Sequence, residues 1–259
     1  MNILNLLEDI NQSDPEVYEK LDSRRSMFGR AGKFAGKVAI AAVPFALGSM
    51  FKEAYGKTSD IVLDTLNFAL TLEYLEAEFY NIGVAQTTLI PASDMAIFKQ
   101  IQQHENAHVT FLKAAITGAG GTPVAKPNFD FTGGKNMGGG PFADYKMNYQ
   151  TFLALSQAFE DTGVRAYKGQ AGNLITNNDV LTAALQIHSV EARHAAQVRR
   201  LRGQKGWITG KETDVTAIQA VYNGEENTMQ GGVNVADTAA FDEPMSKTDV
   251  LAIASIFIY

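Results

Sequence analysis

The chain has 259 residues, of which 46% are hydrophobic and 19% charged, a composition typical of a globular protein with one large domain or two small ones. Its formal net charge of −6 offers no basic surface, so we expect no nucleic-acid partner. Because the sequence has no cysteine, it excludes disulfides, thiolate zinc sites, iron–sulfur clusters and thiol nucleophiles, and it leaves the redox compartment undecided.

Residues 1–58 have the features of an export leader. The paired Arg24 and Arg25 precede a mildly apolar run, residues 34–50, and together they resemble a twin-arginine signal. Small residues near the end of this run, at 46–48, suit a cleavage site. This predicts a periplasmic or otherwise exported protein. The alternative is an amphipathic N-terminal helix of a cytoplasmic protein.

Residues 59–202 show the periodicity of four long helices. The second helix ends at a glycine cluster, and residues 119–143, with seven glycines and three prolines, predict an irregular connection. Two helical hairpins joined by a long crossover make an all-α four-helix bundle. Residues 203–259 form an irregular C-terminal extension, whose apolar end we expect to pack on the bundle or on a partner subunit. The predicted helices span residues 59–86, 93–118, 145–172 and 178–202.

Two Glu-x-x-His motifs are the strongest chemical signal in the chain. Glu105 and His108 lie on the second predicted helix, and Glu191 and His194 lie on the fourth. Residues three apart share one face of a helix, so each pair can hold one metal ion. Two such helices that face each other hold a pair of ions if two more carboxylates join them.

A faint internal repeat indicates which carboxylates these are. Glu73 on the first helix is followed seven residues later by Tyr80, and Glu160 on the third helix is followed at the same spacing by Tyr167. Seven residues are nearly two helical turns, so each tyrosine lies on the same face as its glutamate. We interpret the tyrosines as hydrogen-bond donors to a carboxylate or as electron sources, with a role as plain core aromatics as the alternative.

The electrostatics of this set favour two divalent cations. Four clustered carboxylates repel one another and cannot all ionise alone, whereas two divalent ions cancel their charge. A ligand set of oxygen and imidazole nitrogen suits iron or manganese and leaves open positions for oxygen species.

The motifs resemble those of the ferritin-like carboxylate di-iron superfamily, which includes bacterioferritins and rubrerythrins. The segments Leu72–Tyr80, His104–His108 and Val190–His194 resemble more closely the family of desiccation-related proteins and exported bacterial members. The resemblance implies a ferritin-like bundle with two iron ions, or manganese, as cofactor. The ligands that it implies are Glu73, Glu105, His108, Glu160, Glu191 and His194.

The resemblance also implies a function with several open points. We expect oxidation of ferrous iron, or reduction of oxygen or peroxide, in stress protection. Rubrerythrins supply electrons to the site through a cysteine-bound iron. Because this chain has no cysteine, any reductant must come from outside. The long crossover and the extension give no reason to assume a cage, although a homo-oligomer fits. The alternative function is that of a non-enzymatic stress or desiccation-related protein whose metal centre is structural or absent.

Other residues have simpler interpretations. His104, Glu105 and His108 also match the zinc-protease motif His-Glu-x-x-His, but that reading makes the second Glu-x-x-His a coincidence. We interpret His104 and His188 as histidines outside the ligand set. We expect three acids of the bundle to be solvated charges on helix faces: Glu76, Glu78 and Asp161. Three arginines are expected to pair with surface acids: Arg165, Arg193 and Arg199.

Overall fold

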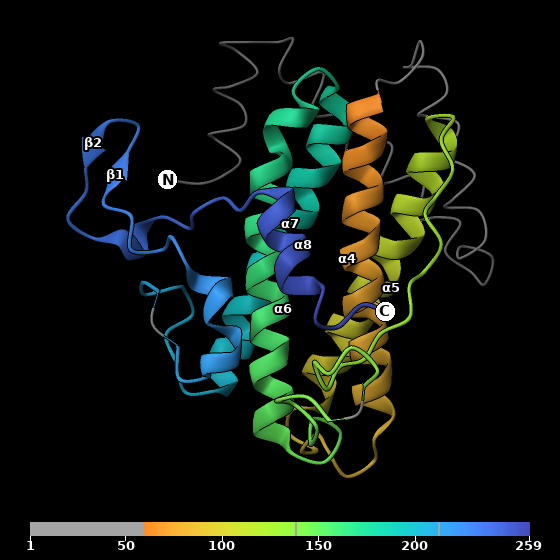
Figure 1. Ribbon diagram of the computed structural model, residues 1–259, viewed down its shortest axis with the longest axis vertical. Helices are drawn as coiled ribbons and strands as arrows, with labels where there is room; N and C mark the ends of the chain where they lie inside the picture. The colour runs from red at the N-terminus through yellow and green to blue at the C-terminus, as the bar shows by residue number, and fades with distance from the viewer. Residues whose placement is uncertain (1–59, 138, 212) are drawn as a thin grey trace, which may run out of the picture. The chain divides into compact units, whose positions relative to one another are not determined.

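The computed structural model describes residues 60–137, 139–211 and 213–259, so the leader prediction for residues 1–58 lies outside the described residues. Four long helices lie side by side: α4 (Asp60–Ala85), α5 (Met95–Gly118), α6 (Tyr149–Gln170) and α7 (Asn178–Leu201) (Figure 1). The all-α bundle predicted from the sequence is confirmed. Within the described part of the chain, no helix is both long and apolar enough to span a bilayer.

The helix ends follow local sequence signals. The Asn148 side chain accepts a hydrogen bond from the Gln150 amide and caps α6. Asn177 caps α7 in the same way by accepting from the Val180 amide. The 3₁₀ helix η2 (Ala171–Leu174) makes a tight connection between these two helices. This turn sets α6 and α7 as one hairpin, and α4 and α5 form the other.

The crossover between α5 and α6 runs back along the bundle, as Figure 1 shows in yellow-green. Its described residues, 119–137 and 139–148, form no long helix or strand, as the glycines and prolines of this segment predict. Phe129 forms an isolated antiparallel bridge with Ile258, which ties the crossover to the end of the chain.

The C-terminal extension has more regular structure than the sequence indicates. It contains a short hairpin and a helix that follows Ser246, which caps it by accepting from the Asp249 amide. Gly169 of α6 allows the extension to approach closely, because an added Cβ would lie 2.0 Å from the Met245 carbonyl oxygen. Its elements are η3 (Thr216–Tyr222), β1 (Met229–Gln230), β2 (Val233–Asn234), η4 (Thr238–Ala240) and α8 (Lys247–Ala254).

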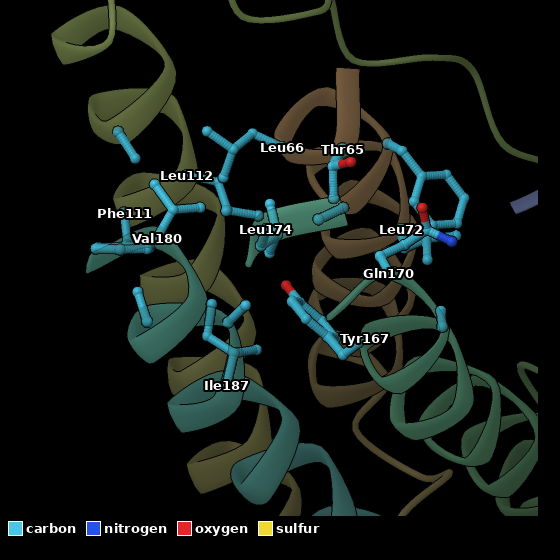
Figure 2. Close-up of a pocket in the computed structure, with 16 residues that line it drawn as sticks. Thr65, Leu66, Leu72, Phe111, Leu112, Tyr167, Gln170, Leu174, Val180 and Ile187 are labelled. Atoms are coloured by element: carbon cyan, nitrogen blue, oxygen red, sulfur yellow. The ribbon is translucent and has the colours of Figure 1, made fainter. Parts of the chain in front are cut away.

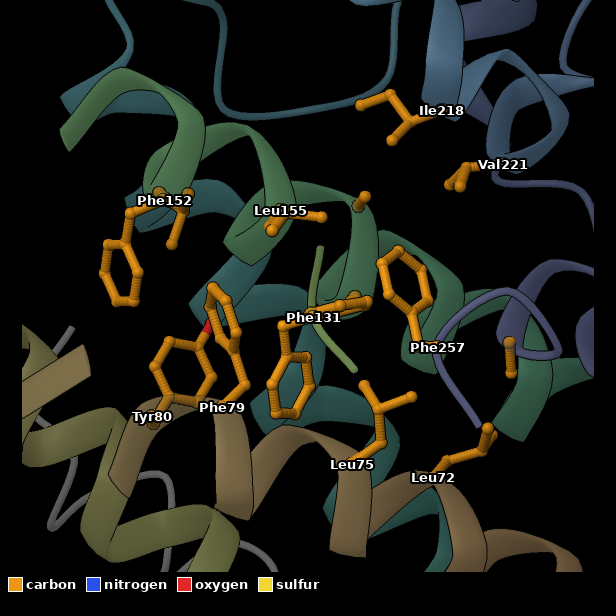
Figure 3. Close-up of a cluster of buried hydrophobic side chains, with 14 of the residues drawn as sticks. Leu72, Leu75, Phe79, Tyr80, Phe131, Phe152, Leu155, Ile218, Val221 and Phe257 are labelled. Carbon is orange, nitrogen blue, oxygen red and sulfur yellow. The ribbon is translucent and has the colours of Figure 1, made fainter. Parts of the chain in front are cut away.

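The core consists of two apolar clusters. In the larger one, Phe79 of α4 stacks on Phe152 of α6 with ring centroids 4.8 Å apart, and Phe131 and Phe257 pack beside them (Figure 3). The smaller cluster joins residues of all four long helices and of η2. Tyr80 belongs to the larger cluster and Tyr167 to the smaller one, so the polar centre that both tyrosines contact is flanked by apolar packing.

Candidate metal centre

Each of the four long helices contributes to one buried polar cluster. α4 and α6 supply one glutamate each, and α5 and α7 supply one Glu-x-x-His pair each. The four glutamates have no exposed surface, and both histidines are largely buried. The structure thus brings together all six ligands that the sequence predicts: Glu73, Glu105, His108, Glu160, Glu191 and His194.

His108 is the centre of one half of the cluster. Its Nδ1 lies 3.1 Å from a carboxylate oxygen of Glu73, 3.1 Å from one of Glu105 and 3.1 Å from one of Glu191. The three acids come from α4, α5 and α7, so this one nitrogen marks the point where three helices meet.

His194 is the centre of the other half. Its Nδ1 lies 2.9 Å from Glu105, 3.2 Å from Glu160 and 3.9 Å from Glu191. The arrangement mirrors that around His108, with α6 in place of α4.

The two halves share two carboxylates. Each half offers four ligand atoms that all lie within 4.8 Å of one another, and Glu105 and Glu191 belong to both sets. Within the described residues, Glu105 Oε1 and both oxygens of Glu191 are buried without a hydrogen bond. Buried carboxylate oxygens need such a partner or a cation, and histidine nitrogens lie 2.9 to 3.9 Å from these oxygens. The donor set is therefore compatible with metal binding, and Glu105 and Glu191 could contribute to either half.

The two tyrosines cross between the hairpins. Tyr80 of α4 donates to Glu160 Oε1 of α6 over 2.5 Å, and Tyr167 of α6 donates to Glu73 Oε1 of α4. The repeat predicts that each tyrosine lies on the face of the glutamate of its own helix. The structure shows in addition that each hydroxyl group bonds the glutamate of the opposite helix. The crossed bonds leave the second oxygen of Glu73 and of Glu160 facing a histidine.

The protonation of the cluster without metal follows from burial and charge. Burial raises the pKa of Glu73 to about 8 despite the opposing effect of His108, and it raises the pKa of Glu160 well above its usual range. The neighbouring carboxylates raise the pKa of His194 to about 12 against the effect of burial. Protons thus neutralise part of the negative charge of the carboxylates, and a metal ion that binds must displace them.

His104 supports the centre from outside. Its Nδ1 lies 2.8 Å from Nε2 of His194, and its own Nε2 lies 2.6 Å from the Gln100 amide nitrogen. If His194 Nε2–H donates to His104, the Nδ1 of His194 is left free to bind metal. His104 is absent from both ligand sets, so the zinc-protease interpretation of His104 and His108 loses its geometric basis.

Glu76 is a fifth buried carboxyl group beside the four clustered glutamates, so the prediction that it is solvated is wrong. It is 3% exposed, and burial together with Glu191 and Glu73 raises its pKa well above its usual range. An added Cβ at Gly163 would lie 3.2 Å from Glu76 and 3.5 Å from Glu191, so this glycine makes room for both acids. Glu78, by contrast, is partly exposed and pairs with Lys126, which is also at the surface.

Asp161 and two arginines are also buried, contrary to the prediction of solvated or surface positions. Arg199 donates to Asp161 over 2.5 Å, and Tyr222 of the extension donates to the same carboxylate over 2.8 Å. Arg165 is 2% exposed and pairs with Glu225 over 2.9 Å. The extension packs on this face of α6 and excludes water from it. The helical periodicity of α6 alone does not predict which segment packs on this face.

A comparison with protein-family models finds one family along most of the bundle. Residues 61–204 match the model described as a ferritin-like domain, which is more than half of the chain. No curated protein matches the sequence. The matched segment begins with α4, ends just after α7 and contains all six of the clustered ligand candidates.

Proposed function

The chain belongs to the ferritin-like domain family, and on that premise we propose that its buried cluster binds two divalent metal ions, of which iron is the first candidate, and oxidises ferrous iron with oxygen or peroxide. The observation that carries the proposal is the pair of ligand sets that share Glu105 and Glu191. We assign the activity to protection against oxidative stress, because it consumes ferrous iron together with its oxidant. Manganese is the alternative metal.

The chemistry of the donors supports two ions rather than one. Four carboxylates and two imidazoles provide six side chains, and the two shared glutamates each have oxygens that no hydrogen bond satisfies within the described residues. One divalent ion leaves two negative charges of four glutamates uncompensated in a fully buried site, whereas two ions balance the charge.

The residues around the cluster would prepare it for redox chemistry. Bound iron would supply the electrons: two ferrous ions lose one electron each, and dioxygen with two protons becomes hydrogen peroxide, or hydrogen peroxide with two protons becomes two waters. Tyr80 and Tyr167 hold Glu160 and Glu73 in place through the crossed hydrogen bonds. Phe79 and Phe98, which lie beside Tyr80, exclude water from its side of the cluster.

Metal stoichiometry tests the proposal. Purified protein would be stripped with a chelator, loaded anaerobically with ferrous iron, desalted and measured by elemental analysis. We expect about two ions per chain in the wild type and at most about one in Glu105→Ala or Glu191→Ala, since each of these glutamates belongs to both sets. Oxidation of the loaded ions in air would be followed by absorbance.

Glu76→Gln is the matched control. It also changes a fully buried glutamate beside the cluster, but Glu76 is in neither ligand set, so both ions should remain. Two ions in both alanine variants would refute the ligand assignment. A folded wild type that binds no iron or manganese would leave a structural or stress-related role without metal as the better interpretation.

A further inference from the structure

A small cavity lies one helical turn away from the metal-binding cluster. Ala69, which lines it, precedes Glu73 by four residues, and Ile187, which also lines it, precedes Glu191 by four. Residues four apart lie on one face of a helix, about one turn apart, so the cavity occupies the layer next to the cluster. Figure 2 shows the lining side chains of four helices converging on it, with Tyr167 on one side.

Tyr167 connects the cavity to the cluster. Its ring lines the cavity, and its hydroxyl group donates to Glu73, one of the proposed ligands. A molecule in the cavity would therefore contact a side chain that bonds directly to the centre. The cavity is thus separated from the proposed ligand Glu73 by the Tyr167 side chain alone on this side.

The cavity suits a small apolar molecule. The cavity has a volume of ≈ 20 Å³, counted as the space open to the centre of a water-sized sphere. This is room for one small molecule. A buried water needs two to four polar partners, and the lining is almost wholly aliphatic or aromatic. Of its few polar side chains, Tyr167 already bonds Glu73, and Gln170 already accepts from Asn173. Hydrogen peroxide has the same need for polar partners as water.

We propose that this cavity holds dioxygen and supplies it to the centre along the Tyr167 side. The proposal rests on the proposed function and narrows it, because it makes dioxygen, rather than peroxide, the oxidant that enters by this route. The lining residues Phe111, Ala183 and Ala184 are partly exposed, so the cavity approaches the surface between α5 and α7.

Ala184→Leu is designed to fill the cavity from its outer side. Leucine keeps a strong helix former at the position and adds three carbon atoms to the lining. Ala114→Leu is the matched control, since Ala114 is a partly exposed helical alanine of α5 that does not line the cavity. If Ala184→Leu does not fold by circular dichroism, Ala183→Leu replaces it, because Ala183 also lines the cavity from α7.

Xenon probes the cavity without metal or activity. Crystals of the metal-free protein would be pressurised with xenon, and anomalous scattering would locate the bound atom. We expect xenon beside Tyr167 in the wild type and in Ala114→Leu, and none in Ala184→Leu. An empty cavity in the wild type, or xenon bound equally in Ala184→Leu, would overturn the proposal.

Oxidation kinetics test the supply of dioxygen. Ferrous-loaded proteins would be mixed in a stopped-flow instrument with dioxygen at several concentrations and, separately, with hydrogen peroxide. We expect Ala184→Leu to lower the second-order rate with dioxygen by about tenfold and to leave the rate with peroxide within about twofold. An unchanged rate with dioxygen, or an equal fall with both oxidants, would overturn the route.

The metal content of each loaded sample separates the two proposals. If the wild type binds no metal, the proposed function fails and the supply role fails with it, whatever xenon shows. If about two ions bind and the kinetics of Ala184→Leu match the control, the function stands and only the route fails.

Discussion

The crossed tyrosines show how single side chains join the two hairpins. Each hydroxyl group spans from one hairpin to a glutamate of the other, and both glutamates are fully buried. A buried carboxylate that loses a donor incurs a desolvation cost, so these bonds stabilise the fold as well as the site. The sequence predicts that both tyrosines lie near the centre. Spacing along one helix cannot predict which glutamate of another helix each tyrosine bonds.

Replacing Tyr167 with phenylalanine tests this contribution. Tyr167→Phe removes the donor to Glu73 Oε1 and should lower the free energy of unfolding of the metal-free protein by about 1–3 kcal/mol, measured by urea denaturation. Tyr74→Phe is the control, because Tyr74 is a buried tyrosine of the same helix as Glu73 whose hydroxyl group forms no hydrogen bond with the described residues. Equal losses in the two variants would contradict the prediction.

The residues that meet in the polar cluster could be predicted from sequence, but several other buried charges could not. The Glu-x-x-His spacing depends only on helix geometry, which the chain determines locally. The burial of Asp161 depends instead on Tyr222, which lies 61 residues further along the chain. Glu76 is buried because Gly163 of another helix leaves space for it. Contacts between distant residues decide both cases.

At the scale of elements, α6 differs from the other long helices in being buried on almost every side. An unbroken run from Phe152 to Tyr167 is buried. One face holds Glu160 in the cluster, and another meets the extension, where Arg165 donates to three backbone carbonyls, those of Val221, Asn223 and Glu243. The extension thus fixes the helix that carries one of the proposed ligands.

The close approach at Gly169 can be tested by adding one methyl group. Gly169→Ala places a Cβ 2.0 Å from the Met245 carbonyl oxygen, so the backbone of the extension must move. We expect a loss of stability of about 1–3 kcal/mol and faster cleavage of the extension in limited proteolysis.

Gly172→Ala provides the comparison for that variant. Gly172 lies three residues further on, in η2, and an added Cβ there meets nothing within 4 Å. Its stability and its rate of cleavage should stay close to those of the wild type. If Gly169→Ala behaved in the same way, the extension would not be held against α6 as described.

Glu225 makes the stability of the folded protein depend on pH. Burial raises its pKa from 4.5 to about 7, although Arg165 opposes the shift. The folded state therefore holds a proton that the unfolded state releases, and this contribution to stability is lost as pH rises from about 4.5 to about 7, by at most about 3 kcal/mol.

Unfolding curves of Glu225→Gln between pH 4.5 and 8 test that sign. The wild type should lose stability relative to the variant as pH rises, because glutamine does not titrate. Glu226→Gln, a change at the exposed neighbouring residue, should give a curve close to that of the wild type. Parallel curves for wild type and Glu225→Gln would refute the assignment.

At the scale of the whole molecule, the four-helix bundle is easier to predict from the sequence than the structure of the extension. The four helices were predicted to within about four residues at their ends, and the connecting crossover was predicted from its glycines and prolines. Helical periodicity and turn residues are local signals, and the bundle depends mainly on them. The hairpin of β1 and β2 and the buried polar contacts of the extension depend on docking against α6, which no local pattern encodes.

Metal should stabilise the whole bundle, because ligands from all four long helices meet at one centre. An ion present at about 100 times its dissociation constant adds about 2.7 kcal/mol per site, or roughly 5–10 °C in melting temperature for a domain of this size. Thermal unfolding with ferrous iron and then with a chelator measures the shift. Glu105→Ala should lose most of it, and a full shift in that variant would contradict the proposed role of Glu105 in both ligand sets.

The crossed hydrogen bonds give one chain the layout of a symmetric dimer. A hairpin of α6 and α7 alone carries a glutamate, a tyrosine and a Glu-x-x-His pair, and two such hairpins face to face would reproduce the crossed tyrosine bonds and the side chains of both ligand sets. Joining the two halves in one chain allows them to diverge. Residue 104, before Glu105, is a histidine that contacts His194, whereas the matching residue 190, before Glu191, is a valine without a ring nitrogen. The two halves of the cluster are therefore chemically unequal, and if two ions bind as proposed, an ion in one half should exchange at a different rate from an ion in the other.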